Sequence, residues 1–177
     1  MLVGNTPRRV AVIAGSRIPF ARGNGAYATL SNADMLSAAI TGLVDRCRLR
    51  GQRLGDVIGG AVLKHSRDFN LVRECVLSSG LDPHTPGLDV QRACGTSLEA
   101  AILVANKIAL GQMDVGIACG VDTVSDPPVV FGKPFRDLLM RAHRARGAGQ
   151  RLGAFLGVRP GHFKPVFPGV NEPRTGL

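Results

Sequence analysis

Residues 88–100 read LDVQRACGTSLEA, and this stretch decides the fold class and locates the strongest candidate for a reactive group. Leu88–Ala93 is a short β-rich run, and apolar residues at helical spacing follow it from Leu98 onward. A buried strand that leads directly into a helix is typical of α/β domains. Cys94 lies at the turn between the two predicted elements.

The helix after Cys94 has recognisable ends in the sequence. Thr96 and Glu99 have the T-x-x-E spacing of a capping box, which predicts Thr96 as the N-cap, and Gly111 suits the C-terminal end. One apolar face is expected to be buried. It comprises Leu98, Ile102, Ala105 and Ile108.

Three further β-rich runs alternate with helical patterns along the chain. They are Val10–Ala14, Asp56–Leu63 and Val115–Cys119, and each is bounded or interrupted by glycine. Apolar runs of this kind, separated by helices, predict buried parallel strands in βαβ units.

Two helical patterns lie between these runs. Ser31 and Asp34 have capping-box-like spacing, and an apolar stripe follows them as far as Cys47. A shorter helix is expected around Leu71–Val76. The sequence therefore predicts an α/β fold with a mostly parallel sheet and helices on both faces.

The character of the chain changes after Asp122. Prolines and basic residues dominate there, and only one helix is expected, at about Phe135–Arg146. We therefore expect an α/β domain over residues 1–123, followed by a truncated, basic, Pro-rich loop domain over residues 124–177.

Composition narrows the classes of partner. The net charge of +9 favours anionic partners, whereas one Tyr and no Trp argue against an aromatic platform for RNA or single-stranded DNA, so we expect no nucleic acid. No apolar stretch approaches the length of a membrane span. The four cysteines form no C-x-x-C pair and have no metal-ligand spacing with His, so we expect reduced thiols, no metal site and a cytoplasmic protein.

Cys94 is placed differently from the other three cysteines. Cys47, Cys75 and Cys119 lie within apolar patterns, which predicts that they are small core residues. Cys94 comes just before a predicted helix, whose unpaired N–H groups and dipole should stabilise a thiolate and make it a nucleophile. Gly95 would permit a tight turn and close approach of a substrate. A buried core position for Cys94 is the alternative that position alone leaves open.

Four stretches of the chain resemble the thiolase family, the acyl-CoA acetyltransferases. Val10–Phe20 is similar to the opening of thiolases, Asp56–Leu63 to their second strand, and Asp89–Ala100 to the segment that carries their nucleophilic cysteine. Phe163–Leu177 resembles the β-subunit branch of fatty-acid oxidation. The resemblance covers nearly the whole chain in order.

The resemblance implies a reaction and a set of roles. Cys94 would accept the acyl group of an acyl-CoA, and its own backbone N–H would contribute to an oxyanion hole. The reaction would be cleavage of a 3-ketoacyl-CoA by coenzyme A or the reverse Claisen condensation, with coenzyme A as a substrate and no cofactor. Gly95, Arg136 and Arg144 are the expected substrate-binding residues, the two arginines through the phosphates of coenzyme A.

The sequence departs from the family pattern in three ways, one of which is that Gly120–Ser125 is a loose version of a glycine-rich turn. Ile18 stands where thiolases usually have Thr. The second thiolase half, with its Asn-Glu-Ala-Phe element, its Gly-His-Pro histidine and its second cysteine, has no counterpart here. His162 is the only histidine considered as a substitute base. We therefore expect a fragment with an intact nucleophile and an incomplete catalytic cycle.

Two other functions stay open at this point. The chain could be a non-catalytic module that pairs with itself, with a complementary thiolase half or with a full-length relative, in a β-oxidation multienzyme assembly. Alternatively, the basic stretch from Lys133 to Arg151 could bind an anionic surface through its charge.

Overall fold

The computed structural model describes residues 7–166, and the chain divides into two compact units between Asp126 and Pro127. The first unit holds the three longest strands and helices α1 to α3, and the second holds helices α4 and α5. The assignment of residues 1–123 and 124–177 as separate domains stays a prediction. Within the described residues, no helix is long and apolar enough to cross a membrane.

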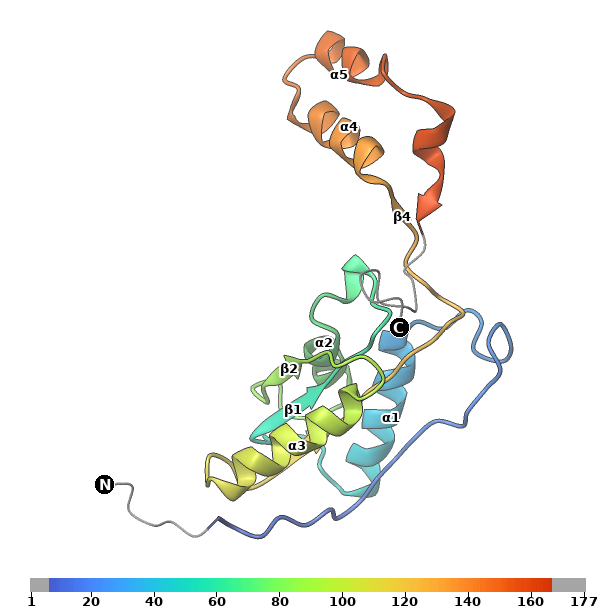
Figure 1. Ribbon diagram of the computed structural model, residues 1–177. Coiled ribbons are helices and arrows are strands. Elements are labelled where there is room, and N and C mark those ends of the chain that lie inside the picture. Colours follow the sequence, from blue (N-terminus) through green and yellow to red (C-terminus); the bar gives the residue numbers. More distant parts are fainter. Residues whose placement is uncertain (1–6, 167–177) are drawn as a thin grey trace. The chain divides into compact units, whose positions relative to one another are not determined.

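A three-stranded parallel sheet forms the centre of the first unit (Figure 1). Val57 in the middle strand pairs with Gly87 on one side and with Ile117 on the other, so both edges of that strand are occupied. The strands are shorter than the sequence predicts. In the order β2-β1-β3 they are Gly87–Asp89, Asp56–Gly59 and Gly116–Ala118.

Helices cover both faces of this sheet. Successive side chains of a strand point to opposite faces, so Val57 belongs to one core cluster and Ile58 to the other. The Val57 cluster contains residues of α1 and α2, whereas the Ile58 cluster contains residues of α3. The predicted α/β class with helices on both faces is confirmed. The three helices are Asn32–Arg46 (α1), Leu71–Ser78 (α2) and Thr96–Ala109 (α3).

The start of α1 agrees with the sequence prediction. Ser31 is the N-cap, its hydroxyl accepts a hydrogen bond from the Asp34 N–H at 3.2 Å, and the Asp34 carboxylate accepts one from the Ser31 N–H at 2.9 Å. Hydrogen bonds from Ser31 hold the pKa of Asp34 below its usual value. This reciprocal pair is the predicted capping box.

The start and the buried face of α3 differ from the prediction. Gly95 is the N-cap and Thr96 is already helical, so no capping box forms. Thr96, Ala100 and Val104 face the core, whereas Leu98 is 67% exposed. The apolar residues of this helix continue around two sides, and Ile108 of the predicted face packs against the core while Leu98 and Ile102 are exposed.

The predicted first strand, Val10–Ala14, is wrong. This run is extended but joins no ladder, and Val12 is 98% exposed (Figure 1). Arg8 holds one end, through its N–H to the Ala109 carbonyl at 3.0 Å, and Arg46 binds the Gly15 carbonyl at 3.0 Å. An apolar run forms a strand only where it pairs with another strand, and this run pairs with neither β2 nor β3, the outer strands of the sheet.

The second unit is small and has an aromatic core. Phe135 contacts Phe131 and Phe163, each with ring centroids 4.9 Å apart, and Leu138 is fully buried. The helix predicted at 135–146 is confirmed as α4, while α5 was not predicted because its sequence is rich in glycine. The elements are β4 (Val130–Phe131), α4 (Lys133–Arg144), α5 (Ala148–Phe155) and β5 (Pro165–Val166), with the two strands antiparallel.

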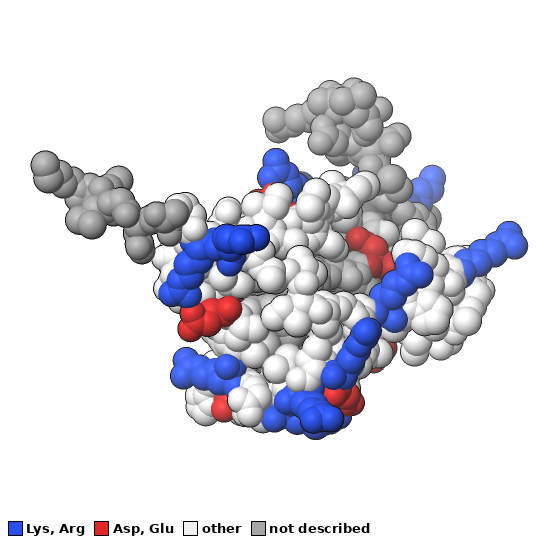
Figure 2. Space-filling model, turned by 90° about the horizontal axis from the view of Figure 1, so that it is seen from below, with Lys and Arg blue, Asp and Glu red and all other residues white. Residues whose placement is uncertain are grey.

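Basic side chains of the first unit have acidic side chains beside them. On the face shown in Figure 2, basic side chains lie around the margin, several with acidic neighbours, and uncharged surface fills the middle. Several basic side chains of the first unit are paired with carboxylates, as Arg8 is with Asp114 at 2.5 Å and Arg92 with Glu99 at 2.6 Å.

Candidate active site

The turn between β2 and α3 is fixed by its own hydrogen bonds. The Thr96 hydroxyl accepts a bond from the Arg92 N–H and donates one to the Ala93 carbonyl, both at 2.8 Å. The Gly95 N–H donates to the Arg92 carbonyl at 2.9 Å. Ala93 has φ of 44°, a left-handed conformation that costs about 1 kcal/mol or more for a residue with a Cβ. The neighbouring residue, Cys94, is thereby held at a sharp bend.

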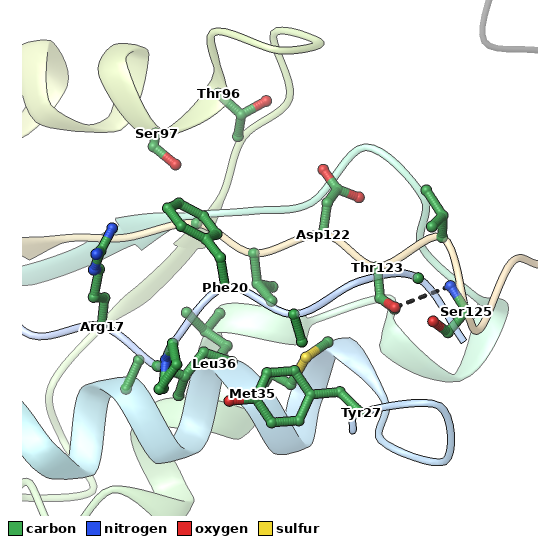
Figure 3. Close-up of a pocket in the computed structure, with 18 of the residues that line it drawn as sticks. Arg17, Phe20, Tyr27, Met35, Leu36, Thr96, Ser97, Asp122, Thr123 and Ser125 are labelled. Carbon is green, nitrogen blue, oxygen red and sulfur yellow. Dashed lines mark hydrogen bonds between the residues drawn. The ribbon is translucent and has the colours of Figure 1, made fainter. Parts of the chain in front are cut away.

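Cys94 is exposed and lines a cavity of about 560 Å³ in the first unit. Three parts of the chain that are distant in sequence form its wall. They are residues 16–23, residues 93–97 without Gly95, and residues 120–125, together with Gly60, Tyr27 and three residues of α1 (Met35, Leu36 and Ala39). In Figure 3, Thr96 and Ser97 at the start of α3 lie on one side of the cavity, and Met35 and Leu36 of α1 lie on the other. Phe20 and Asp122 lie between these two pairs.

Glycines allow the walls of the cavity to approach one another. A Cβ at Gly60 would overlap the Val90 carbonyl oxygen, and a Cβ at Gly120 would overlap the Ser97 hydroxyl. The carboxyl ends of parallel strands meet at one edge of a sheet, and here these glycines bring the segments after β1, β2 and β3 together.

Asp122 is a cavity residue that the sequence analysis did not single out. Its carboxylate accepts hydrogen bonds from the N–H groups of Val62 and Leu63, each at 2.9 Å. These bonds fix the segment that follows β1 against the segment that follows β3. The available signal was an acidic residue directly after a strand, in the Gly-Val-Asp-Thr-Val-Ser sequence of residues 120–125.

Cys75 and Cys119 are part of the packing of the first unit. Cys75 is fully buried and burial raises the pKa of its thiol, while burial raises the pKa of the half-buried Cys119 to about 12. Cys75 belongs to the core cluster under α1 and α2, and Cys119 packs against that cluster, as predicted. Of the four cysteines, Cys94 is the exposed one and the one that lines the cavity.

The predicted substrate-binding residues lie in different units. Gly95 neighbours the cavity as the N-cap of α3, and a Cβ there would stand 3.4 Å from the Arg92 carbonyl oxygen, so the turn itself does not require glycine. Arg136 and Arg144 belong to α4 in the second unit, where Arg136 approaches Asp137 at 3.6 Å. Their contact with coenzyme A stays a prediction.

None of the four histidines lines the cavity around Cys94. His65 contacts the Asp126 carboxylate at 3.1 Å, and His84 contacts Asp82 at 2.9 Å. The ring of His162 accepts a hydrogen bond from the Arg159 N–H at 3.4 Å. Within residues 7–166, no group of three His, Cys, Asp or Glu side chains could hold a metal ion.

Comparisons with known proteins bear on this site. Residues 10–153 match the family model described as thiolase, N-terminal domain. A 3-ketoacyl-CoA thiolase of Shewanella halifaxensis is 35% identical over 169 residues, which are 96% of this chain and 39% of the relative. One from Cronobacter sakazakii is 35% identical over 176 residues, which are 99% of this chain and 40% of the relative.

A solved structure supports the fold. The acetyl-CoA acetyltransferase of Bacillus anthracis superposes with a TM-score of 0.69 and 24% identity, over 74% of this chain and 33% of that chain. The chain spans about two fifths of the length of the curated relatives that it matches. The family model matches most of the chain, and the chain therefore belongs to the thiolase family, within the part that forms its N-terminal domain.

Proposed function

We propose that the chain carries the acyl-accepting half of a thiolase-type acyl-CoA C-acyltransferase site, with Cys94 as the nucleophile. The observation that carries this proposal is the position of Cys94, which is exposed on the wall of a cavity at the start of α3, while Cys75 is buried and Cys119 half-buried. The names of the relatives, 3-ketoacyl-CoA thiolase, support an acyl-CoA substrate.

The first step is transfer of an acyl group from one sulfur to another. The Cys94 Sγ forms a bond to the thioester carbonyl carbon, the bond from that carbon to the sulfur of coenzyme A breaks, and the proton lost by Cys94 reaches the departing thiolate through solvent. Among the described residues, no atom accepts a hydrogen bond from the Cys94 N–H. This N–H is therefore free to stabilise the oxyanion that forms on the carbonyl oxygen.

The complete cycle needs groups that this cavity does not contain. Cleavage of a 3-ketoacyl-CoA, or the reverse Claisen condensation, requires acid–base catalysis at the α-carbon and at the thiol. No histidine lines the cavity, and loss of such a group removes roughly 10²–10⁴ in rate. We infer that Cys94 accepts the acyl group and that the full cycle needs acid–base groups from outside this cavity, supplied by a second polypeptide or by a longer parent chain.

The remaining expectations belong to the same proposal. Arg136 and Arg144 contact the phosphates of coenzyme A, Gly95 gives the thioester room to approach, and no cofactor takes part. The protein acts in the cytoplasm, in fatty-acid β-oxidation, as an oligomer or in a multienzyme assembly. The names of the relatives support the pathway, and the contacts of the two arginines require a ligand-bound structure to test.

Acylation by acetyl-CoA tests the proposal. The intact chain should gain one acetyl group at Cys94 and release one equivalent of coenzyme A, whereas Cys94→Ser should gain none. Cys47→Ser is the matched control, because it removes a thiol outside the cavity and should leave the acetylation unchanged. Acetylation spread over several cysteines would remove Cys94 from its proposed role.

A second function, as a pairing module, is favoured by the exposed edges of the sheet. Strands β2 and β3 are the outer strands of the three-stranded sheet in the described chain, and exposed strand edges pair readily with other chains. The apolar run Val10–Ala14 is also unpaired, and Ile13 is 88% exposed. Co-expression with a complementary thiolase half should raise the soluble yield, and a reversible monomer with no gain from co-expression would argue against this function.

A further inference from the structure

The cavity that Cys94 lines has a largely apolar wall. Helix α1 contributes Met35 and Ala39 to it, and the part of the chain before that helix contributes Phe20 and Tyr27. Sites for small molecules in proteins have volumes of about 300–1,000 Å³ and are lined mostly by apolar side chains. The cavity, at about 560 Å³, has the size and the lining of such a site.

Several polar side chains of this wall already bind the backbone. Thr96 and Asp122 accept hydrogen bonds from backbone N–H groups. The Ser125 hydroxyl accepts one from the Asn24 N–H at 2.8 Å, and the Thr123 hydroxyl accepts one from the Ser125 N–H at 3.0 Å (Figure 3). A ligand in the cavity therefore meets apolar side chains more than free polar ones.

The cavity has an exposed rim and a buried floor. Phe20 at the rim is 89% exposed, whereas Met35 is 5% and Leu36 is 1% exposed. In Figure 3 the two α1 side chains lie on the side of the cavity away from Ser97, which follows Cys94 by three residues. A chain attached to the Cys94 Sγ can therefore extend across the cavity toward α1.

We propose that this cavity is the subsite for a straight aliphatic acyl chain, and that Met35 and Ala39 set the acyl length that it accepts. These two residues are four positions apart, so they present successive turns of one face of α1 to the cavity. This role of α1 rests on the proposed function, because the thioester at Cys94 fixes one end of the acyl chain in the cavity. A segment of another polypeptide in the same cavity would give no dependence on acyl length.

A series of saturated acyl-CoA substrates, from acetyl-CoA to palmitoyl-CoA, tests the subsite. Mass spectrometry of the full-length protein measures the rate at which each substrate acylates Cys94. Each added methylene leaves water for an apolar surface, so the rate should rise by up to about fourfold per methylene until the acyl chain reaches the floor. Beyond that length the rate should stop rising.

Ala39→Leu is the most direct variant, because it fills the cavity from α1 without removing a core side chain. It should lower the ratio of octanoylation to acetylation about tenfold or more, since the longer acyl chain loses the space that the new side chain takes. Ala38→Leu is the matched control. It adds the same side chain at the exposed neighbouring position and should leave this ratio unchanged.

Met35→Ala should have the opposite effect. The shorter side chain deepens the floor, so the rate should continue to rise to longer acyl groups than in the unmodified protein. Met113→Ala is the control, because Met113 is similarly buried but belongs to the core cluster of α3 and does not line the cavity. It should leave the limiting acyl length where it is. Urea denaturation identifies the folded variants, and Ala39→Leu decides the question if Met35→Ala is unfolded.

Binding to Cys94→Ser separates the subsite from acyl transfer. This variant has lost the thiol but keeps the cavity, and in equilibrium dialysis it should bind octanoyl-CoA about tenfold more tightly than acetyl-CoA. If no acyl-CoA modifies Cys94 while this difference persists and Ala39→Leu removes it, acyl transfer is wrong and the subsite stands.

Three outcomes would overturn the subsite. One is acylation of Cys94 at the same rate by every acyl-CoA, which would leave acyl transfer intact. Another is an equal effect of Ala39→Leu and Ala38→Leu on the ratio of octanoylation to acetylation. The third is equal binding of octanoyl-CoA and acetyl-CoA by Cys94→Ser, which together with an absence of acylation would overturn both proposals.

Discussion

Cys94 and Cys119 both follow parallel strands of the same sheet, yet their environments differ. Cys119 comes directly after β3, its N–H donates to the Ile58 carbonyl at 2.9 Å, and burial raises the pKa of its thiol to about 12. Cys94 comes five residues after β2 and is exposed at the start of α3. A position near the carboxyl end of a strand therefore does not make a reactive cysteine. The chain must also leave the ladder and turn before the sulfur reaches a cavity.

Replacement of the glycine beside each cysteine should give the largest difference in the free energy of unfolding. A Cβ at Gly59 would overlap the Cys119 Sγ and would lie 2.7 Å from the Cys119 carbonyl oxygen, so Gly59→Ala must distort the centre of the sheet. We expect it to lower the free energy of unfolding by about 3 kcal/mol. Urea denaturation measures the change.

Gly95→Ala is the matched control for this prediction. Its Cβ would stand 3.4 Å from the Arg92 carbonyl oxygen, and the loss should stay below about 1 kcal/mol. Equal losses for the two variants would mean that the turn at Cys94 is as tightly packed as the strand at Cys119.

Alkaline pH should destabilise the chain through Cys119. The thiol has its ordinary pKa of 9.0 in the unfolded chain and a pKa of about 12 in the folded one, so the folded chain binds more protons between these values. The stabilising contribution is complete below pH 9.0 and falls by on the order of 1 kcal/mol per pH unit above it. Cys119→Ala should flatten this slope relative to the unmodified chain.

Cys94→Ala serves as the control for the alkaline measurement, because it removes an exposed thiol. Its slope of unfolding free energy against pH should follow that of the unmodified chain. A flattened slope in Cys94→Ala and not in Cys119→Ala would reverse the comparison between the two cysteines.

Thr96→Val should loosen the turn at Cys94 without changing the shape of the side chain. The hydroxyl is buried and bonds both Arg92 and Ala93, so its loss leaves the Arg92 N–H without this acceptor, while the Ala93 carbonyl keeps its bond from the Thr96 N–H at 3.2 Å. We expect a loss of about 1–2 kcal/mol and slower alkylation of Cys94 in the folded chain. Site-resolved mass spectrometry measures the alkylation rate, and an unchanged rate would show that the turn does not position Cys94.

Ala93→Gly should give the smallest change in the free energy of unfolding. Glycine removes the cost of a left-handed residue at φ 44° but adds freedom to the unfolded chain, so the net change should lie within about 1 kcal/mol and be stabilising. The same change in a strand, Ala118→Gly, should destabilise by a similar amount. A destabilised Ala93→Gly would mean that no strain is stored beside Cys94.

Local sequence patterns predicted the structural features that depend only on neighbouring residues in the chain. Ser31 and Asp34 form the expected capping box because both partners lie within one turn of α1. Thr96 and Glu99 have similar spacing, but Arg92 binds the Glu99 carboxylate at 2.6 Å and donates its N–H to the Thr96 hydroxyl. The N-cap of α3 is therefore Gly95, one residue before the predicted N-cap Thr96.

Features that depend on contacts between distant parts of the chain could not be predicted from local sequence patterns. The apolar run Val10–Ala14 was predicted as a strand, yet pairing depends on contact with a distant strand, and this run joins neither outer strand of the sheet. Cys94 was identified from its position before a helix, but its cavity also needs residues 16–23 and Asp122. Only the folded chain brings these segments together, so the sequence predicted the candidate nucleophile and not the walls around it.

Competitive labelling of the four cysteines tests the central claim most directly. The folded chain is treated with chloroacetyl-CoA, and adducts are assigned by mass spectrometry with and without excess coenzyme A. We predict that Cys94 is modified about a hundredfold or more faster than Cys75 and Cys119, and that coenzyme A slows this reaction alone. Comparable modification of all four sites, or a Cys94 rate that coenzyme A does not change, would contradict an acyl-accepting role.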